Sequence, residues 1–222
     1  MNNWMKYWND DNRVESDDPQ VRIGRTKSGD VIDDLWMRTL EYISNEMDIN
    51  KDDNLLDVCA GSGCISIPFS SRVKSVKAID ISEKLMIPYI GGNISHQVGD
   101  INNIEIENKF SKVIIYFALQ YFTLSETVRL FKKIFDCLED GGIFYCGDIP
   151  NESKKFDFYD TPERKDVYFN TLYNDKTILG YWFTKEFLEE LGKYTGFKYV
   201  EVKNQPDYLF NSEYRFDIIL KK

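Results

Sequence analysis

The chain contains little of what metal chemistry and nucleic-acid binding require. It has a single histidine, His96, and its four cysteines lack the short paired spacings of zinc sites: Cys59, Cys64, Cys137 and Cys146. Lys and Arg total 28 against 37 Asp and Glu, so the formal net charge is -9. Because affinity for nucleic acids and anionic membranes depends on basic residues, this composition argues against both partners. We expect a reduced protein that holds no metal.

Long hydrophobic runs are missing as well. No stretch approaches the roughly 20 apolar residues of a membrane span, and the polar, acidic start carries no apolar signal-peptide region. These features predict a cytoplasmic protein that does not cross a membrane. Lys132 and Lys133 are interpreted as a solvated helix face rather than as a basic patch. The sequence leaves open whether the protein is a monomer or a homodimer.

Apolar and aromatic residues are abundant by contrast. The 222 residues are 42% hydrophobic and 15% aromatic, which is enough to form a real core in one large domain or in a domain with an insertion. Aromatic side chains also line pockets for small organic ligands. The aromatic excess therefore fits either a larger core or a ligand site.

Short apolar segments alternate with amphipathic ones along most of the chain. Strands are expected over 54–60, 75–81, 93–100, 112–119 and 142–149. Helices are expected over 31–47, from Ser82 to a bend or end at Pro88, and over 125–142 with Ser125 as the N-cap. Continuous apolar runs in the central strands predict a parallel sheet that is covered on both faces.

The end of the chain follows a different pattern. A helix over 183–197 precedes two strands, 197–204 and 214–222, whose short link predicts an antiparallel pair. The predicted fold is therefore α/β: a Rossmann-like three-layer sandwich with a mostly parallel seven-stranded sheet ending in an antiparallel hairpin. The chain divides into an N-terminal segment (1–30), a core (31–148), an insertion (149–183) and a C-terminal helix and hairpin that complete the core (184–222).

The segment LLDVCAGSGC at 55–64 is the most informative motif. It places Asp57 at the end of the first strand, and Gly61 and Gly63 then allow a tight turn with close approach of the backbone to a ligand. Asp80 follows 17 residues after Gly63, at the end of the second strand. A carboxylate there can accept hydrogen bonds from ribose hydroxyls. The alternative for both carboxylates is a helix cap or a surface turn.

This pattern resembles the class I S-adenosylmethionine-dependent methyltransferases. Their first motif is a strand, an acidic residue and then Gly-x-Gly-x-Gly, and here Cys59 stands where the first glycine is usual. The resemblance continues through GDI at 99–101, YFALQYF at 116–122 and the final hairpin. It covers roughly residues 30–148 and 184–222, which is most of the chain.

The resemblance implies S-adenosylmethionine as cofactor and S-adenosylhomocysteine as product. It implies these contacts: Asp57, Ala60, Gly61 and Ser62 beside the methionine part, with Gly63 in the turn; Asp80 at the ribose; Ile81 against the adenine; Asp100 and Ile101 at its edge; and Tyr116 and Phe117 near the sulfonium.

The main rival is a nicotinamide-dependent oxidoreductase. Its fingerprint is Gly-x-Gly-x-x-Gly, and Gly61, Gly63 and Ser66 supply only two of the three glycines. A methyltransferase-fold protein that binds without turnover is the second alternative.

The acceptor is predicted to be a small molecule. Enzymes that methylate exocyclic base nitrogens resemble one another in an Asp/Asn-Pro-Pro-aromatic motif after the fourth strand, where this chain has Tyr116-Phe117-Ala118-Leu119. The segments YFALQYF and GGIFYCGDIP look like those of bacterial methyltransferases encoded with surface-polysaccharide genes. That resemblance implies a sugar or a sugar-linked metabolite of polysaccharide biosynthesis.

Most candidates for acceptor binding lie outside the cofactor-binding core, in the N-terminal lid or substrate segment (1–30) and in the insertion over the acceptor site (149–183). They are Tyr7, Trp8, Arg25, Tyr168 and Tyr181, together with Tyr121 from the core. The aromatic N-terminal residues could instead pack as a lid helix on the core. Arg25 could anchor an anionic group, or it could be an ordinary surface arginine.

A hydroxyl acceptor gives up its proton to a general base, and the candidates are Asp148, a tyrosine of the insertion and His96. Asp148 ends the fifth strand, at the sheet edge where functional groups gather. His96 lies in or beside the third strand, which is nearer the adenine than the methyl group. We interpret His96 as structural in preference to catalytic.

Overall fold

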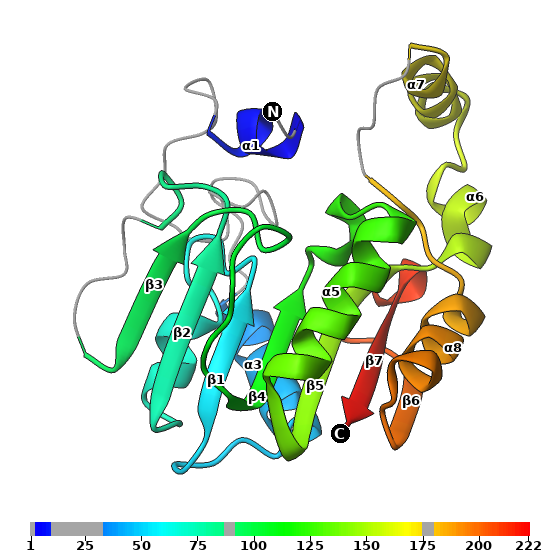
Figure 1. Ribbon diagram of the computed structural model, residues 1–222. Coiled ribbons are helices and arrows are strands. Elements are labelled where there is room, and N and C mark those ends of the chain that lie inside the picture. Colours follow the sequence, from blue (N-terminus) through cyan, green and yellow to red (C-terminus); the bar gives the residue numbers. More distant parts are fainter. Residues whose placement is uncertain (1–2, 10–32, 87–91, 175–179) are drawn as a thin grey trace.

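The computed structural model describes residues 3–9, 33–86, 92–174 and 180–222 (Figure 1). Its centre is a seven-stranded sheet in the order β3-β2-β1-β4-β5-β7-β6. Neighbours among β1–β5 pair in parallel, and β7 is antiparallel to both β5 and β6. The predicted sheet and its closing hairpin are therefore confirmed. The strands are β1 (Asn54–Val58), β2 (Ser75–Asp80), β3 (Ile94–Val98), β4 (Phe110–Tyr116), β5 (Leu138–Pro150), β6 (Tyr199–Asn204) and β7 (Arg215–Lys221).

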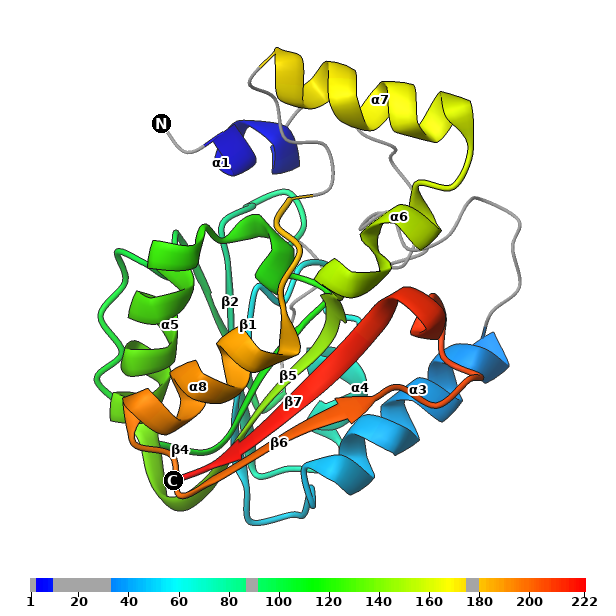
Figure 2. The ribbon, with the colours of Figure 1, turned by 90° about the vertical axis from the view of Figure 1, so that its right-hand side faces the viewer.

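Helices cover both faces of the sheet (Figures 1 and 2). On one face, α5 (Leu124–Cys137) and α8 (Lys185–Thr195) pack on a core that includes Phe131 and Phe144. On the other face, α3 (Asp33–Glu46) and α4 (Ser66–Ser70) pack on a core that includes Leu40. Both faces of the central strands are thereby removed from water, which explains their continuous apolar runs.

Helix α5 begins two residues earlier than the sequence pattern predicts. Its N-cap is Thr123, not Ser125: the Thr123 hydroxyl accepts the Glu126 N–H at 3.2 Å, and the Glu126 carboxylate accepts the Thr123 N–H at 2.8 Å. This reciprocal pair satisfies two backbone donors at the helix start. The helix also ends at Cys137, well before the predicted residue 142, because β5 begins at Leu138.

The helix predicted from Ser82 does not form in its described part, since residues 83–86 are turns. The Ser82 N–H donates to Asp80 Oδ1 at 2.8 Å, and the Ser82 hydroxyl accepts from Leu85 N–H at 3.3 Å. These two bonds close one turn against the end of β2. The site of the predicted bend, Pro88, lies outside the described residues.

The insertion leaves the sheet at the end of β5 and carries three helical segments: η2 (Glu152–Lys154), α6 (Lys155–Phe158) and α7 (Pro162–Tyr173). Its two ends are joined, because Glu152 N–H donates to the Phe183 carbonyl and Phe183 N–H to the Pro150 carbonyl, both at 2.9 Å. Figure 2 shows α7 and the short α1 (Asn3–Trp8) beyond the same end of the sheet. Helix α7 buries no residue, so its packing is weak.

None of the helices in the described parts of the chain is both long and apolar enough to span a membrane. Those same parts contain no group of three or more His, Cys, Asp or Glu side chains that could hold a metal ion.

Candidate active site

A pocket opens at the carboxyl ends of β1, β2 and β4, where ligands bind in open α/β sheets. It contains about 990 Å³ of empty space including its mouth, within the range of small-molecule sites. Many of the residues predicted for the cofactor line it: Asp57, Ala60, Gly61, Asp80, Ile81, Asp100, Ile101, Tyr116 and Phe117. Of the predicted acceptor residues, Trp8 and Tyr121 line it as well.

Asp80 connects the end of β2 to the glycine turn. Its Oδ2 accepts the Gly61 N–H at 2.8 Å and its Oδ1 accepts the Ser82 N–H at 2.8 Å. Burial raises the pKa of this carboxyl, while the backbone hydrogen bonds oppose that shift. Asp80 therefore fixes the turn on one side of the pocket and presents its carboxylate at the end of the strand.

Asp57 is also buried at the end of its strand, and it accepts a hydrogen bond from the Ser66 hydroxyl at 2.6 Å. Burial is the largest cause that raises its pKa to about 7, and the Ser66 hydroxyl opposes the shift. Sequence reasoning noted Ser66 only as a missing glycine of the rival fingerprint. A serine at the start of the helix after a Gly-rich turn, facing an acidic strand end, was the signal that could have identified it.

The turn between these two carboxylates has a left-handed backbone at three positions. Gly61 and Gly63 have φ of 55° and 83°, which glycine adopts without strain. Cys59 has φ of 59°, at the position where the family has its first glycine. The conformation of the motif is therefore kept although the residue differs, at a strain of about 1–2 kcal/mol for a side chain with a Cβ.

The loop after β3 is held in place by Lys133 of α5. Its ammonium donates to the carbonyls of Ile101, Asn102 and Ile104 at 2.7, 3.0 and 2.8 Å. The prediction that Lys133 is a solvated surface lysine is therefore wrong. Desolvation lowers its pKa. Lys133 positions the loop that brings Asp100 to the pocket.

Helix α1 lies at the mouth of the pocket and contacts both sides of it. The Ser82 hydroxyl donates to the Trp8 carbonyl at 2.9 Å, which ties the helix to the end of β2. On the other side, the rings of Trp4 and Trp8 lie 4.5 and 5.5 Å from the ring of Tyr121. The ring of Tyr7 makes T-shaped contacts with both tryptophan rings, but Tyr7 does not line the pocket.

Other predicted residues lie away from this pocket. His96 is exposed on the edge strand β3, and Ser62 and Gly63 belong to the turn without being among the lining residues. Tyr168 and Tyr181 line a second pocket, which lies within the insertion. Arg25 lies outside the described residues.

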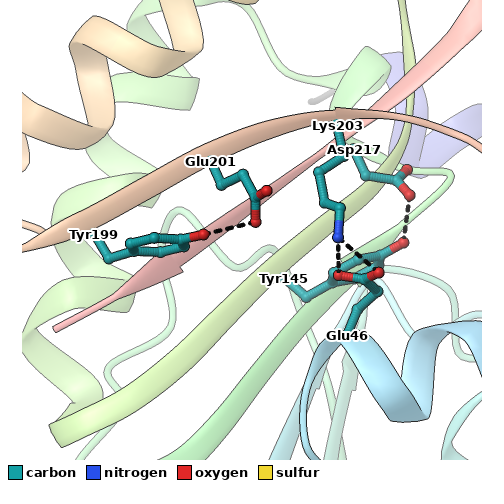
Figure 3. Close-up of polar contacts among 6 residues, drawn as sticks. All are labelled: Glu46, Tyr145, Tyr199, Glu201, Lys203 and Asp217. Atoms are coloured by element: carbon teal, nitrogen blue, oxygen red, sulfur yellow. Dashed lines mark hydrogen bonds and ion pairs between the residues drawn. The ribbon is translucent and has the colours of Figure 1, made fainter.

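Asp148 sits in an irregularity of the β5–β7 pairing with φ of 59°. Its N–H donates to Asp217 Oδ1 at 2.8 Å. Tyr145 donates its hydroxyl to the other oxygen of the same carboxylate, Asp217 Oδ2, at 2.7 Å (Figure 3). Burial raises the pKa of Asp217 to about 6. Asp148 Oδ1 is 4.0 Å from Arg215 Nε, so the carboxylate is turned to a buried ion pair rather than to the cofactor pocket.

Arg215 connects this buried group to the pocket. Its Nη1 donates to Gln120 Oε1 at 2.6 Å and to the Asp148 carbonyl at 3.0 Å. Its guanidinium also lies 5.3 Å from the ring centre of Phe117, a pocket residue with φ of 57°. Figure 3 further shows the Lys203–Glu46 ion pair, at 2.7 Å, which joins β6 to α3. Sequence reasoning missed Arg215, because no neighbouring residue in the sequence indicates a cation that contacts the segment after β4.

A mostly parallel sheet of this order, with carboxylates at the ends of β1 and β2, defines the Rossmann-like methyltransferase fold. In agreement, residues 55–142 match the family model of the methyltransferase domain. The match covers the strands and the glycine turn that form the pocket, and it leaves the insertion and the C-terminal hairpin outside it. No curated protein matches the sequence.

Solved structures share the fold at low sequence identity. An S-adenosylmethionine-dependent methyltransferase from Methanosarcina mazei has a TM-score of 0.59 at 18% identity, over 82% of this chain and 96% of that one. The N-methyltransferase NodS from Bradyrhizobium japonicum has a TM-score of 0.63 at 12% identity, over 86% and 99%. Magnesium protoporphyrin IX methyltransferase from Synechocystis with bound S-adenosylmethionine has a TM-score of 0.59 at 13% identity, over 99% and 89%.

The pocket fits S-adenosylmethionine, which is bound in the Synechocystis structure that shares this fold. Asp57 and Asp80 present buried carboxylates to polar groups, and Ile81 and Ile101 present apolar surface for a flat ring. Bound there, the cofactor supplies an activated methyl group. The protein's part is to align an acceptor and to exclude water.

Proposed function

We propose that the protein transfers a methyl group from S-adenosylmethionine to a small-molecule acceptor in the cytoplasm. The observation that carries this proposal is the pair of buried carboxylates, Asp57 and Asp80, on either side of the glycine turn. In the proposed arrangement Asp57 faces the methionine part, Asp80 the ribose, and Ile81 with Asp100 the adenine. Tyr116 and Phe117 form the floor beneath the sulfonium.

The finer proposal is that the acceptor is a sugar or a sugar-linked metabolite of polysaccharide biosynthesis. The second pocket supports a site for such a molecule, because aromatic faces are good partners for ring-shaped ligands. Tyr159 and Tyr168 lie 4.6 Å apart there, and Trp182 lies 6.0 Å from Tyr159. Tyr168 and Tyr181 are thus proposed to contact the body of the acceptor.

The two candidate bases have different positions. Asp148 is buried beside Arg215, so we propose that it positions Arg215 and Phe117 and does not remove a proton. His96 is exposed on an edge strand away from the pocket, which favours a surface role.

The test is calorimetric titration with S-adenosylhomocysteine, followed by mass spectrometry of products from a metabolite extract and labelled methyl donor. Micromolar or tighter binding and a labelled product are expected. Binding of NAD in its place would indicate the oxidoreductase, although the antiparallel β7 between β5 and β6 departs from the all-parallel dinucleotide order. Binding without any labelled product would indicate the non-catalytic alternative.

A further inference from the structure

The charges around the cofactor pocket have one sign. Among the lining residues that the structure describes, four are carboxylates and none is Lys, Arg or His. Three of the carboxylates are those proposed for the cofactor. The fourth, Glu126, is engaged in capping α5 through the N–H and hydroxyl of Thr123.

Aromatic rings form a large part of the remaining wall. The seven rings come from α1, α3, the end of β4 and the segment that follows it: Trp4, Trp8, Trp36, Tyr116, Phe117, Tyr121 and Phe122. The ring planes of Trp4 and Tyr121 meet at 60° and those of Trp8 and Tyr121 at 79°. The three rings therefore do not form a parallel stack. The faces of such rings attract cations, most of all ammonium groups that have lost water.

We propose that the methyl acceptor is an amine whose nitrogen binds against this aromatic wall, an inference that rests on the proposed methyl transfer. A carboxylate or phosphate acceptor would enter a pocket of like charge, with no described cation to pair with it. A hydroxyl acceptor needs a base for its proton. Every carboxylate in the described lining already has another task, in the cofactor site or in the helix cap.

The chemistry of an amine matches this wall. The lone pair of the neutral nitrogen forms a bond to the methyl carbon, while the carbon–sulfur bond breaks and its electron pair stays on sulfur. The nitrogen thereby takes up the positive charge and then releases one proton to solvent. Positive charge is present in the pocket before and after the transfer, and aromatic faces together with carboxylates stabilise it at both stages.

The test compares two probes of the same shape on protein saturated with S-adenosylhomocysteine. Choline carries a quaternary ammonium, and 3,3-dimethylbutan-1-ol is its uncharged counterpart. Calorimetry should give choline an affinity at least about tenfold higher, the size of a desolvated cation–π contact. Equal affinities would overturn the inference. Failure of S-adenosylhomocysteine itself to bind would instead overturn the proposed function.

Variants of the wall give a second readout. In Trp4→Leu the preference for choline should fall severalfold, whereas Trp4→Phe keeps a ring and should keep most of it. An equal preference for choline in both variants and in the unmodified protein would contradict binding of the amine nitrogen against the aromatic wall. Treating the metabolite extract with an amine-acylating ester before the assay should abolish the labelled product, and a product that survives the treatment would contradict an amine acceptor.

Discussion

The cofactor end of the pocket and the insertion over residues 151–183 are built in opposite ways. At the cofactor end, Asp57 and Asp80 are buried at strand ends and each holds a neighbouring segment by hydrogen bonds of 2.6–2.8 Å. In the insertion, α7 buries no residue, and backbone hydrogen bonds to the end of β5 close its neck. The sheet therefore fixes the geometry of the proposed cofactor site, while the segment proposed to cover the acceptor is loosely packed and can adapt.

The largest effect is expected when Asp80 is removed, the carboxylate that holds two segments at the cofactor end of the pocket. Asp80→Ala leaves the N–H groups of Gly61 and Ser82 without their acceptor, at about 1–3 kcal/mol each, and also removes the proposed ribose partner. Affinity for S-adenosylhomocysteine should fall at least about 100-fold by calorimetry. The matched control in the second region, Asp160→Ala, removes an exposed partner of Arg164 and should leave that affinity within about twofold.

A second change tests how the insertion is attached. A Cβ on Gly180 would lie 1.9 Å from the Gln120 carbonyl oxygen, and its φ is 75°. Gly180→Ala should destabilise this attachment by about 2 kcal/mol and speed hydrogen exchange in α6 and α7. Gly141→Ala is the control, because Gly141 has φ of 77° but no atom within 4 Å of the added Cβ. Similar exchange in the two variants would contradict the proposed contact.

A third prediction concerns pH and acts on the cofactor end alone. With a pKa of about 7, Asp57 is largely protonated below that pH in the cofactor-free protein, and that proton must leave before the carboxylate can pair with the amino group of the methionine part. Affinity for S-adenosylhomocysteine should fall by up to about tenfold per pH unit below pH 7 and be flat above it. Asp57→Asn should bind weakly with no such slope. A flat profile for the unmodified protein between pH 6 and pH 8 would disprove this role for Asp57.

The smallest effect concerns the strained residue of the turn. Cys59→Gly removes the strain of a left-handed conformation but raises the conformational entropy of the unfolded chain. The free energy of unfolding should therefore rise by less than about 1 kcal/mol. Cys59→Val places a branched side chain in the same conformation and should lower it by more than that amount. Denaturant titration measures both variants. A loss of stability in Cys59→Gly would show that the thiol contributes more by packing than the strain costs.

The sequence predicted the first region far better than the second. Strand ends that carry Asp57 and Asp80 follow from an apolar run, an acid and a glycine turn, all within short stretches of chain. Lys133 and Arg215 act through contacts with distant backbone and rings, which no local pattern records. The cap at Thr123 differs from the prediction for another reason. Thr123 and Ser125 both fit the local pattern of a helix N-cap, and only the structure distinguishes them.

The neck of the insertion has a consequence for redesign. Asn151 and Phe183 form a parallel bridge, and the backbone bonds of Phe183 go to Pro150 and Glu152 on either side of Asn151. The segment between the two bridge residues is therefore a loop whose ends meet at the end of β5. Exchanging that loop for another of similar span would leave the strand order, the glycine turn and both helical layers in place. If the insertion covers the acceptor as proposed, such exchanges with joints at Asn151 and Phe183 are expected to change which acceptor is methylated.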